Sequence, residues 1–243
     1  MKEHLIRVFQ ETLHREQKKL SIIENPSRKF GQILSFKGIN EIYFLHKAFV
    51  ENDIQGSKEY LYKMGMVNSY YSEIGNRDIF EVLNTFTFPI LSDSSALISR
   101  YLIYEPTQYF DAFSTFFGQS VQSVINKDML SLERSILGLE KHSKNGWEKN
   151  FEGMVTAFKG ILNSDKAQVE HGIDELLGKH DKQGHPSITK DYINYEATTI
   201  AKLSLRTEIN IDIDHTLVPK ELLQVKELSN YKGYPFFDEL SRV

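Results

Sequence analysis

The fold is decided by residues 79–125, which read IFEVLNTFTFPILSDSSALISRYLIYEPTQYFDAFSTFFGQSVQSVI. Phenylalanine, tyrosine and branched aliphatic side chains recur throughout this stretch, and charged side chains are sparse. A helix that is apolar on most sides is buried on most sides. We therefore expect the helices of this stretch to form the core. From Glu81 to Ile125 the charged residues are Glu81, Asp93, Arg100, Glu105 and Asp111.

Capping residues divide this central stretch into three expected helices. Short polar side chains accept hydrogen bonds from the free N–H groups at the start of a helix. Asp78 is therefore expected to begin a helix that runs toward Pro89. Asp93 or Ser94 is expected to begin the next helix. Pro106-Thr107 is expected to start the third helix. Its aromatic and branched members are Tyr109, Phe110, Phe113, Phe116, Phe117, Val121 and Val124.

The chain before the central stretch predicts further amphipathic helices. Residues 3–24 carry apolar side chains at three- and four-residue steps among charged ones, which is the period of a helix with one buried face. This helix should end near Asn25-Pro26. Similar apolar clusters over 39–50 and 60–74 predict two more helices, separated by a turn.

The chain after Asn126 predicts antiparallel helical hairpins. Helices are expected over 128–142, 147–162 and 164–177, joined by short polar loops, with Ser164-Asp165 capping the last of them. Helices joined by short loops pack side by side in opposite directions.

Towards the C-terminus the pattern changes twice. Ser187 is expected to cap a long helix that reaches Arg206. Residues 209–214 alternate apolar and polar side chains, which indicates an extended connector, because an isolated strand has no partner in a helical chain. Residues 218–223 then predict a helix of one or two turns that starts with Pro219.

Composition excludes several classes of function. The 243 residues include no cysteine, so thiol catalysis, redox pairs, cysteine-ligated zinc and iron–sulfur clusters are excluded. The net charge of -4 argues against nucleic-acid binding, which depends on clustered Lys and Arg. No apolar run reaches the length of a membrane span, and the N-terminus lacks the apolar core of a signal peptide. The sequence therefore predicts a cytoplasmic protein with no membrane partner.

Catalytic motifs are scarce. No Gly-x-Ser-x-Gly elbow and no Gly-rich phosphate loop occurs in the sequence. A metal-dependent hydrolase, the third reading of the sequence, would use His180, Asp181, His185 and His215. The nearby His171 lies nine residues before His180, not the three or four that place two ligands on one helical face. We expect no metal and no cofactor.

Glu196 lies among apolar and small residues, where a carboxylate needs a partner. We expect it to form an ion pair with Lys190, Lys202 or Arg206.

The C-terminal third carries a resemblance to a known family. Residues 186–206 read PSITKDYINYEATTIAKLSLR and residues 208–223 read EINIDIDHTLVPKELL. Together they resemble the ending of the immunity protein 49 family of bacterial polymorphic-toxin systems. The Tyr-x-x-Glu-Ala element of residues 192–197 is also similar to an immunity group directed against nuclease toxins of the PoNe type. The resemblance implies an all-helical, non-enzymatic cytoplasmic protein that binds and neutralises a cognate toxin.

The expected architecture is one all-α domain over residues 1–243, with roughly nine to eleven helices stacked as antiparallel hairpins. The expected partner is a protein toxin encoded nearby, and the alternative is a helical adaptor that binds a peptide or protein. Acidic patches speed association with basic proteins, and aromatic side chains anchor interfaces. The residues expected to contact the partner are Asp174, Glu175, Asp181, Tyr192, Tyr195, Glu208, Asp212, Asp214 and Tyr231.

Overall fold

The computed structural model describes residues 2–23, 29–106 and 111–240. Within these ranges the chain is helical and has no β-strand, and eleven of its α-helices have six residues or more, which confirms the predicted all-α class. The α-helices are α1 (Lys2–Ile23), α2 (Lys29–Leu34), α3 (Phe36–Leu45), α4 (Ile54–Glu73), α5 (Thr87–Ser92), α6 (Ser95–Leu102), α7 (Phe113–Asn126), α8 (Met129–His142), α9 (Gly153–Asn163), α10 (Lys166–Gly178), α11 (Tyr195–Arg206) and α12 (Lys220–Leu223).

Shorter helical segments join these helices. One is a π-helical turn, and the others are 3₁₀ turns. They are η1 (His46–Val50, π), η2 (Ile79–Glu81), η3 (Leu83–Phe86), η4 (Glu148–Phe151), η5 (His180–Lys182) and η6 (Pro235–Glu239).

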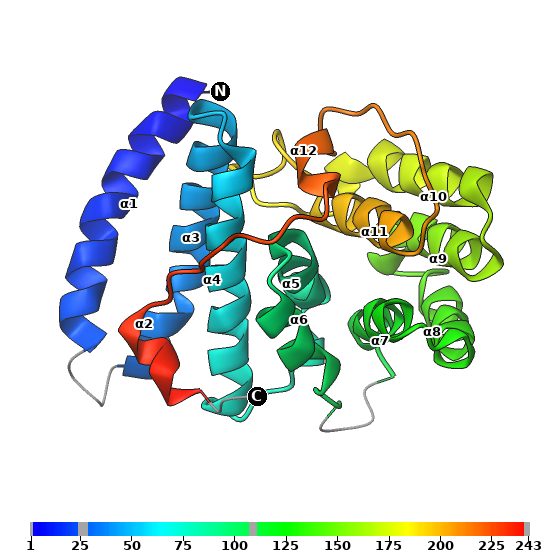
Figure 1. Cartoon of the computed structure of the whole chain (residues 1–243), viewed down its shortest axis with the longest axis horizontal. Coiled ribbons are helices and arrows are strands. Elements are labelled where there is room, and N and C mark those ends of the chain that lie inside the picture. Colours follow the sequence, from blue (N-terminus) through cyan, green and yellow to red (C-terminus); the bar gives the residue numbers. More distant parts are fainter. Residues whose placement is uncertain (1, 24–28, 107–110, 241–243) are drawn as a thin grey trace.

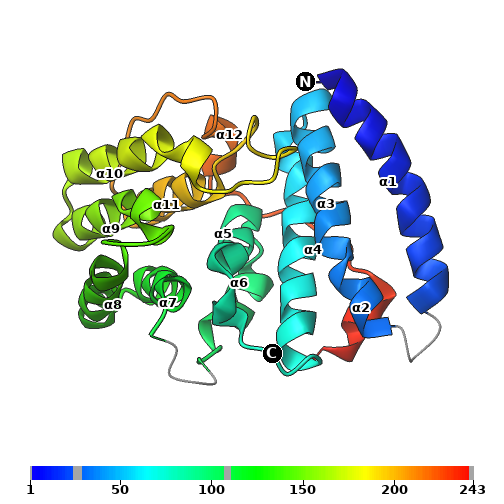
Figure 2. The same ribbon diagram turned by 180° about the vertical axis from the view of Figure 1, so that it is seen from behind.

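The helices form two groups with a short layer between them. Helices α1 to α4 stand side by side at one end of the molecule, and α7 to α11 make up the other end (Figures 1 and 2). Helices α5 and α6 lie between the two groups. After α12 the chain returns across α4 and forms η6 beside α2 (Figure 1). The last described residues therefore contact the first helices.

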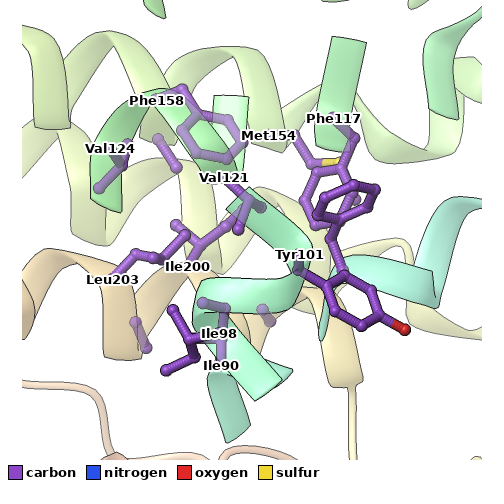
Figure 3. Close-up of a cluster of buried hydrophobic side chains, with 14 of the residues drawn as sticks. Ile90, Ile98, Tyr101, Phe117, Val121, Val124, Met154, Phe158, Ile200 and Leu203 are labelled. Carbon is purple, nitrogen blue, oxygen red and sulfur yellow. The ribbon is translucent and has the colours of Figure 1, made fainter. Parts of the chain in front are cut away.

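The central stretch forms the core, as its composition predicts. Its α5, α6 and α7 contribute Ile90, Tyr101, Phe117 and their neighbours to a cluster that α9 and α11 complete (Figure 3). The members of this cluster are at most 9% exposed. Burial of this size supplies the main driving force for packing the two helix groups together.

The hairpin of α9 and α10 is packed unusually closely. A Cβ atom added to Gly172 would lie 2.3 Å from the main-chain N of Ala157 and 2.6 Å from the carbonyl O of Gly153. Glycine therefore lets the two helix backbones touch. The predicted cap of α10 is confirmed, because Asp165 accepts a hydrogen bond from the main-chain N of Gln168 at 3.1 Å.

The helix predicted after Asp78 is different in the structure. Asp78 caps only the 3₁₀ turn η2, a second 3₁₀ turn follows, and Pro89 lies in the first turn of α5 instead of ending a helix. Proline is tolerated there because N–H groups in the first turn have no helical acceptor. Ser94, one of the two predicted caps, does begin α6.

The prediction that Ser187 begins a long helix is wrong. Residues 187–192 form turns, and α11 begins at Tyr195 because Asn194 Oδ1 accepts a hydrogen bond from the main-chain N of Ala197 at 2.9 Å. The predicted connector is confirmed, since residues 209–214 contain no helix and no strand. The short helix after Pro219 is present as α12.

Three predicted features lie outside the described residues. They are the end of the first helix at Asn25-Pro26, the helix start at Thr107, and the positions of Tyr109 and Phe110. Among the helices that the structure describes, none combines the length and apolar character needed to cross a membrane.

Candidate binding surface and buried charge centre

The connector between α11 and α12 lies against the outer side of α10. The main-chain N of Asp212 donates to Glu170 Oε1 at 2.6 Å. Ile213 points inward and is buried, whereas Asp212 and Asp214 face solvent. Asp174 lies one helical turn beyond Glu170 and is exposed. Two segments distant in sequence thus form an acidic face, defined as Glu170, Asp174, Asp212 and Asp214.

Lysines neutralise this acidic face only in part. Lys166 lies 3.5 Å from Glu170, and Lys220 lies 3.2 Å from Asp214, both on the surface. The carboxylates of Asp174 and Asp212 form no ion pair with any residue that the structure describes. Exposed ion pairs contribute little energy and leave both partners accessible. The face therefore presents a negative charge to solvent.

The other three predicted acidic residues lie outside the acidic face. Glu175 Oε2 accepts a hydrogen bond from Thr156 Oγ1 of α9 at 2.7 Å, and its Oε1 lies 3.7 Å from His171 Nε2, so its carboxylate is engaged within the α9–α10 hairpin. Asp181 is exposed in η5, beyond the end of α10. Glu208 is exposed just after α11, with a left-handed backbone at φ 65°.

The three predicted tyrosines pack on other elements. Tyr195 is buried at 2% exposure, with its ring centroid 5.5 Å from that of Phe88, so it is a core residue and no surface anchor. Tyr192 is half-buried and packs on Phe49 of η1. Tyr231 is half-buried, and its hydroxyl donates to the carbonyl of a residue in α5. The structure does not gather these aromatic rings beside the acidic face.

A second feature is a buried cluster of charges around Asp93, which the sequence did not predict. Lys58 and Lys202 both donate to Asp93 Oδ2 at 2.6 Å, and Arg206 Nη2 donates to Asp93 Oδ1 at 2.6 Å. The side chains of both lysines are fully buried, and Asp93 ends α5 with a left-handed backbone. We call Asp93, Lys58, Lys202 and Arg206 the Asp93 hub.

The hub holds three cationic side chains against one carboxylate. Burial opposes ionisation of Asp93, but the positive charges of Lys202 and Lys58 outweigh it and lower its pKa. Burial lowers the pKa of Lys202 to about 7, and the charges of Lys58 and Arg206 act in the same direction against Asp93. Main-chain carbonyls near the C-terminus supply the remaining acceptors. The hub therefore links α4, α5 and α11 to the end of the chain.

Glu196 does not form the predicted ion pair. It is 4% exposed, its Oε2 has no hydrogen-bond partner among the described residues, and burial raises its pKa to about 7. Lys37 of α3 is the cation that opposes this rise. Lys202 follows six residues later on α11, roughly 240° around the helix, which directs it to Asp93. Lys202 therefore pairs with Asp93 at the end of α5 and not with Glu196 on its own helix.

The histidines considered for a metal site serve structural roles. His180 Nε2 lies 2.7 Å from the carbonyl O of Lys190, and its Nδ1 lies 3.0 Å from Asn194 Nδ2. Burial, and then the charge of His180, lower the pKa of the stacked His185 to about 4. The described residues contain no group of three or more His, Asp or Glu placed to hold a metal ion.

Tyr192 lines a surface recess of about 660 Å³. The recess lies where η1, the start of α4, the 191–192 turn and α12 meet. Phe49 and Tyr192 form an aromatic contact there, with ring centroids 5.1 Å apart. Acidic and basic side chains both border the recess. They are Asp53, Asp191 and Glu221 on one hand and Lys2 and Lys226 on the other.

Comparison of the chain with protein-family models, curated proteins and solved structures found no match.

Proposed function

We propose that this protein is a non-enzymatic immunity protein that binds a cognate protein toxin and neutralises it in the cytoplasm. The observation that carries the proposal is the acidic face, which the Asp212–Glu170 hydrogen bond assembles from α10 and the connector. Two of its four members, Asp212 and Asp214, belong to the segment that resembles the immunity protein 49 family. The proposal therefore rests on two supports, the negative charge of the acidic face and the family resemblance of the segment that carries half of it.

The charge of the face suits a basic partner. Complementary charges steer two proteins together and raise the association rate, and nuclease surfaces that bind nucleic acid are basic. Asp174 and Asp212 are free to pair with Lys or Arg of such a partner. Stoichiometric coverage of the toxin by this face requires no catalytic group in the immunity protein.

The scaffold behind the face is suited to rigid binding. The close contact of α9 and α10 fixes the outer side of α10, and the buried isoleucines fix the connector. A preorganised surface loses little conformational entropy when a partner binds. The face is therefore a preformed patch and needs no induced folding.

A growth assay tests this function. The product of the adjacent open reading frame is expressed in a bacterial host with and without this protein, and the pair is then purified together. The proposal predicts toxicity of the neighbouring product alone, rescue by this protein, and a one-to-one complex. Toxicity without rescue or complex formation would contradict it.

A second candidate function is a peptide-binding adaptor, which one groove favours. The groove has a volume of about 640 Å³ and lies between the end of α6 and helices α7 and α8. Gln119, Asn126 and Arg134 border it, and the buried hydroxyl of Thr115 on its wall has no hydrogen-bond partner among the described residues. Several unrelated peptide partners in place of one toxin would favour this function.

A further inference from the structure

The chain after α12 crosses the molecule in an extended path. From the end of α12 it passes in front of α4 and reaches the bottom of the α1–α4 group as η6 (Figure 1). Residues 224–234 of this path contain no helix and no strand. We call residues 222–239 the clasp.

The Asp93 hub binds the start of the clasp through alternate residues. Lys202 Nζ donates to the carbonyl O of Leu222 at 2.7 Å, and Lys58 Nζ donates to the carbonyls of Gln224 at 3.1 Å and Lys226 at 3.0 Å. Asp93 Oδ2 in turn accepts a hydrogen bond from the main-chain N of Lys226 at 3.1 Å. Leu222 belongs to the last turn of α12, whereas Gln224 and Lys226 lie in the extended chain that follows, where every second carbonyl points to the same side. The buried lysines therefore fix the register of the clasp.

Tyrosines hold the middle and the end of the clasp. Tyr231 donates to the carbonyl O of Ser92, next to Asp93. Farther along, the hydroxyl of Tyr234 donates to Glu16 of α1, and Glu16 also accepts a hydrogen bond from Tyr43 of α3 at 2.7 Å.

The end of the clasp also contacts α4. Glu239 accepts a hydrogen bond from Tyr70 of α4 at 3.0 Å and pairs with Lys29. The clasp thus runs from a charge centre between α4, α5 and α11 to the outer helix α1.

We propose that the clasp docks on the helices and releases from them as one unit. The Asp93 hub holds the start of the docked clasp, and the docked clasp holds α1 in place. The inference is independent of the proposed toxin binding. Loss of the contacts at Lys226 would remove the register that the hub sets for the chain that follows, so that only contacts farther along, such as the Tyr231–Ser92 bond and the buried rings of Phe236 and Phe237, would hold the clasp. Helices α7 to α10 make none of these contacts.

Docking of the clasp also completes the recess beside Tyr192. Gln224 and Lys226 of the clasp form one wall of that recess, and Lys2 of α1 forms another. Release of the clasp would therefore open the recess and loosen α1 together. A molecule that fills the recess would favour the docked clasp, because binding and docking stabilise each other.

Hydrogen exchange of the full-length protein, measured by mass spectrometry, tests the proposal with two proline variants. Lys226→Pro removes the main-chain donor to Asp93 and leaves every buried charge in place. Val225→Pro is the matched control, because Val225 is 52% exposed and its main-chain N has no hydrogen bond among the described residues. Tyr234→Phe removes the hydrogen bonds from the clasp to Glu16 of α1 and to Asn40 of α3.

Lys226→Pro is expected to speed exchange about tenfold in residues 224–239 and in α1 around Glu16, with α9 and α10 unchanged. Val225→Pro should leave all of these regions as they are, and Tyr234→Phe should affect only α1, η6 and α3 around Asn40. Equal effects of the two prolines would overturn the proposal. So would faster exchange in the clasp without any change in α1, or a uniform loss of protection over the whole chain.

Discussion

Asp93 and Lys202 lie 109 residues apart in the sequence, yet Lys202 Nζ donates to Asp93 Oδ2 at 2.6 Å with both side chains at most 1% exposed. Lys58 shares the same oxygen, so one carboxylate holds two buried ammonium groups. A buried charge that loses its partner pays the full cost of desolvation. The stability of the fold therefore depends on Asp93 more than on any surface ion pair.

Asp93→Asn is expected to lower the free energy of unfolding by about 3–5 kcal/mol, because the substitution removes the carboxylate that Lys58, Lys202 and Arg206 share. Each buried lysine must then stay charged without a counter-ion or lose a proton. Urea denaturation of the full-length protein measures the change. Asp174→Asn is the control, since Asp174 is exposed and unpaired, and its effect should stay within about 0.5 kcal/mol. Equal stabilities of the two variants would show that the Asp93 hub contributes nothing.

Glu196 should make stability depend on pH in a defined direction. Its folded pKa of about 7 lies above its ordinary value of 4.5, so the folded state binds more protons between these two values. The stability that Glu196 contributes is fully present below pH 4.5 and is lost as the pH rises through 7. In Glu196→Gln this dependence should vanish.

The measurement is the difference in unfolding free energy between the natural chain and Glu196→Gln at several pH values. The difference should fall with rising pH by up to about 1.4 kcal/mol per pH unit. His185, whose pKa is lowered to about 4, acts in the opposite direction but is common to both chains and cancels. A difference that is constant with pH would refute the buried, proton-binding state of Glu196.

Gly172→Ala should separate α9 from α10. The added methyl group would lie 2.3 Å from main-chain N of Ala157, and backbone atoms cannot move aside independently. We expect a loss of about 1–3 kcal/mol. Gly178→Ala on the same helix meets no atom within 4 Å and should be neutral or stabilising. Thermal unfolding followed by circular dichroism distinguishes the two, and equal melting temperatures would contradict the close packing.

The start of α11 offers a direct comparison of the predicted and the observed cap. Asn194→Ala removes the acceptor for the main-chain N of Ala197 and should cost about 1 kcal/mol or more. Ser187→Ala should change stability by less than about 0.5 kcal/mol, since Ser187 is exposed in a turn. Chemical denaturation of both variants decides between the two sites. A larger effect at Ser187 would favour the longer helix.

Local signals in the sequence predict much of the helical fold. The apolar stretch around α5 to α7 forms the core, and Asp165 and Ser94 cap the helices for which they were suited. The sequence alone does not place the start of α11, because both Ser187 and Asn194 are good caps and only the packing of the turn around His180 selects Asn194.

The features that the sequence does not predict depend on contacts between residues that are far apart in the chain. Aspartate is a common helix cap, so Asp93 looks like an ordinary cap in the sequence. Nothing near it in the sequence indicates that Lys58 and Lys202 are its partners. The sequence indicates three members of the acidic face, Asp174, Asp212 and Asp214, whereas its link through Glu170 depends on how the connector returns to α10. Burial of Tyr195 was likewise set by α3 and α5.

The most direct measurement is the dissociation constant of the complex with the toxin encoded next to this chain, determined by calorimetry for two charge-reversal variants. Asp174→Lys/Asp212→Lys reverses the acidic face, and Glu3→Lys/Glu133→Lys makes the same change in net charge on exposed positions of α1 and α8. The account predicts at least about tenfold weaker binding for the first variant and an unchanged constant for the second. Equal affinities of the natural chain and Asp174→Lys/Asp212→Lys would contradict it.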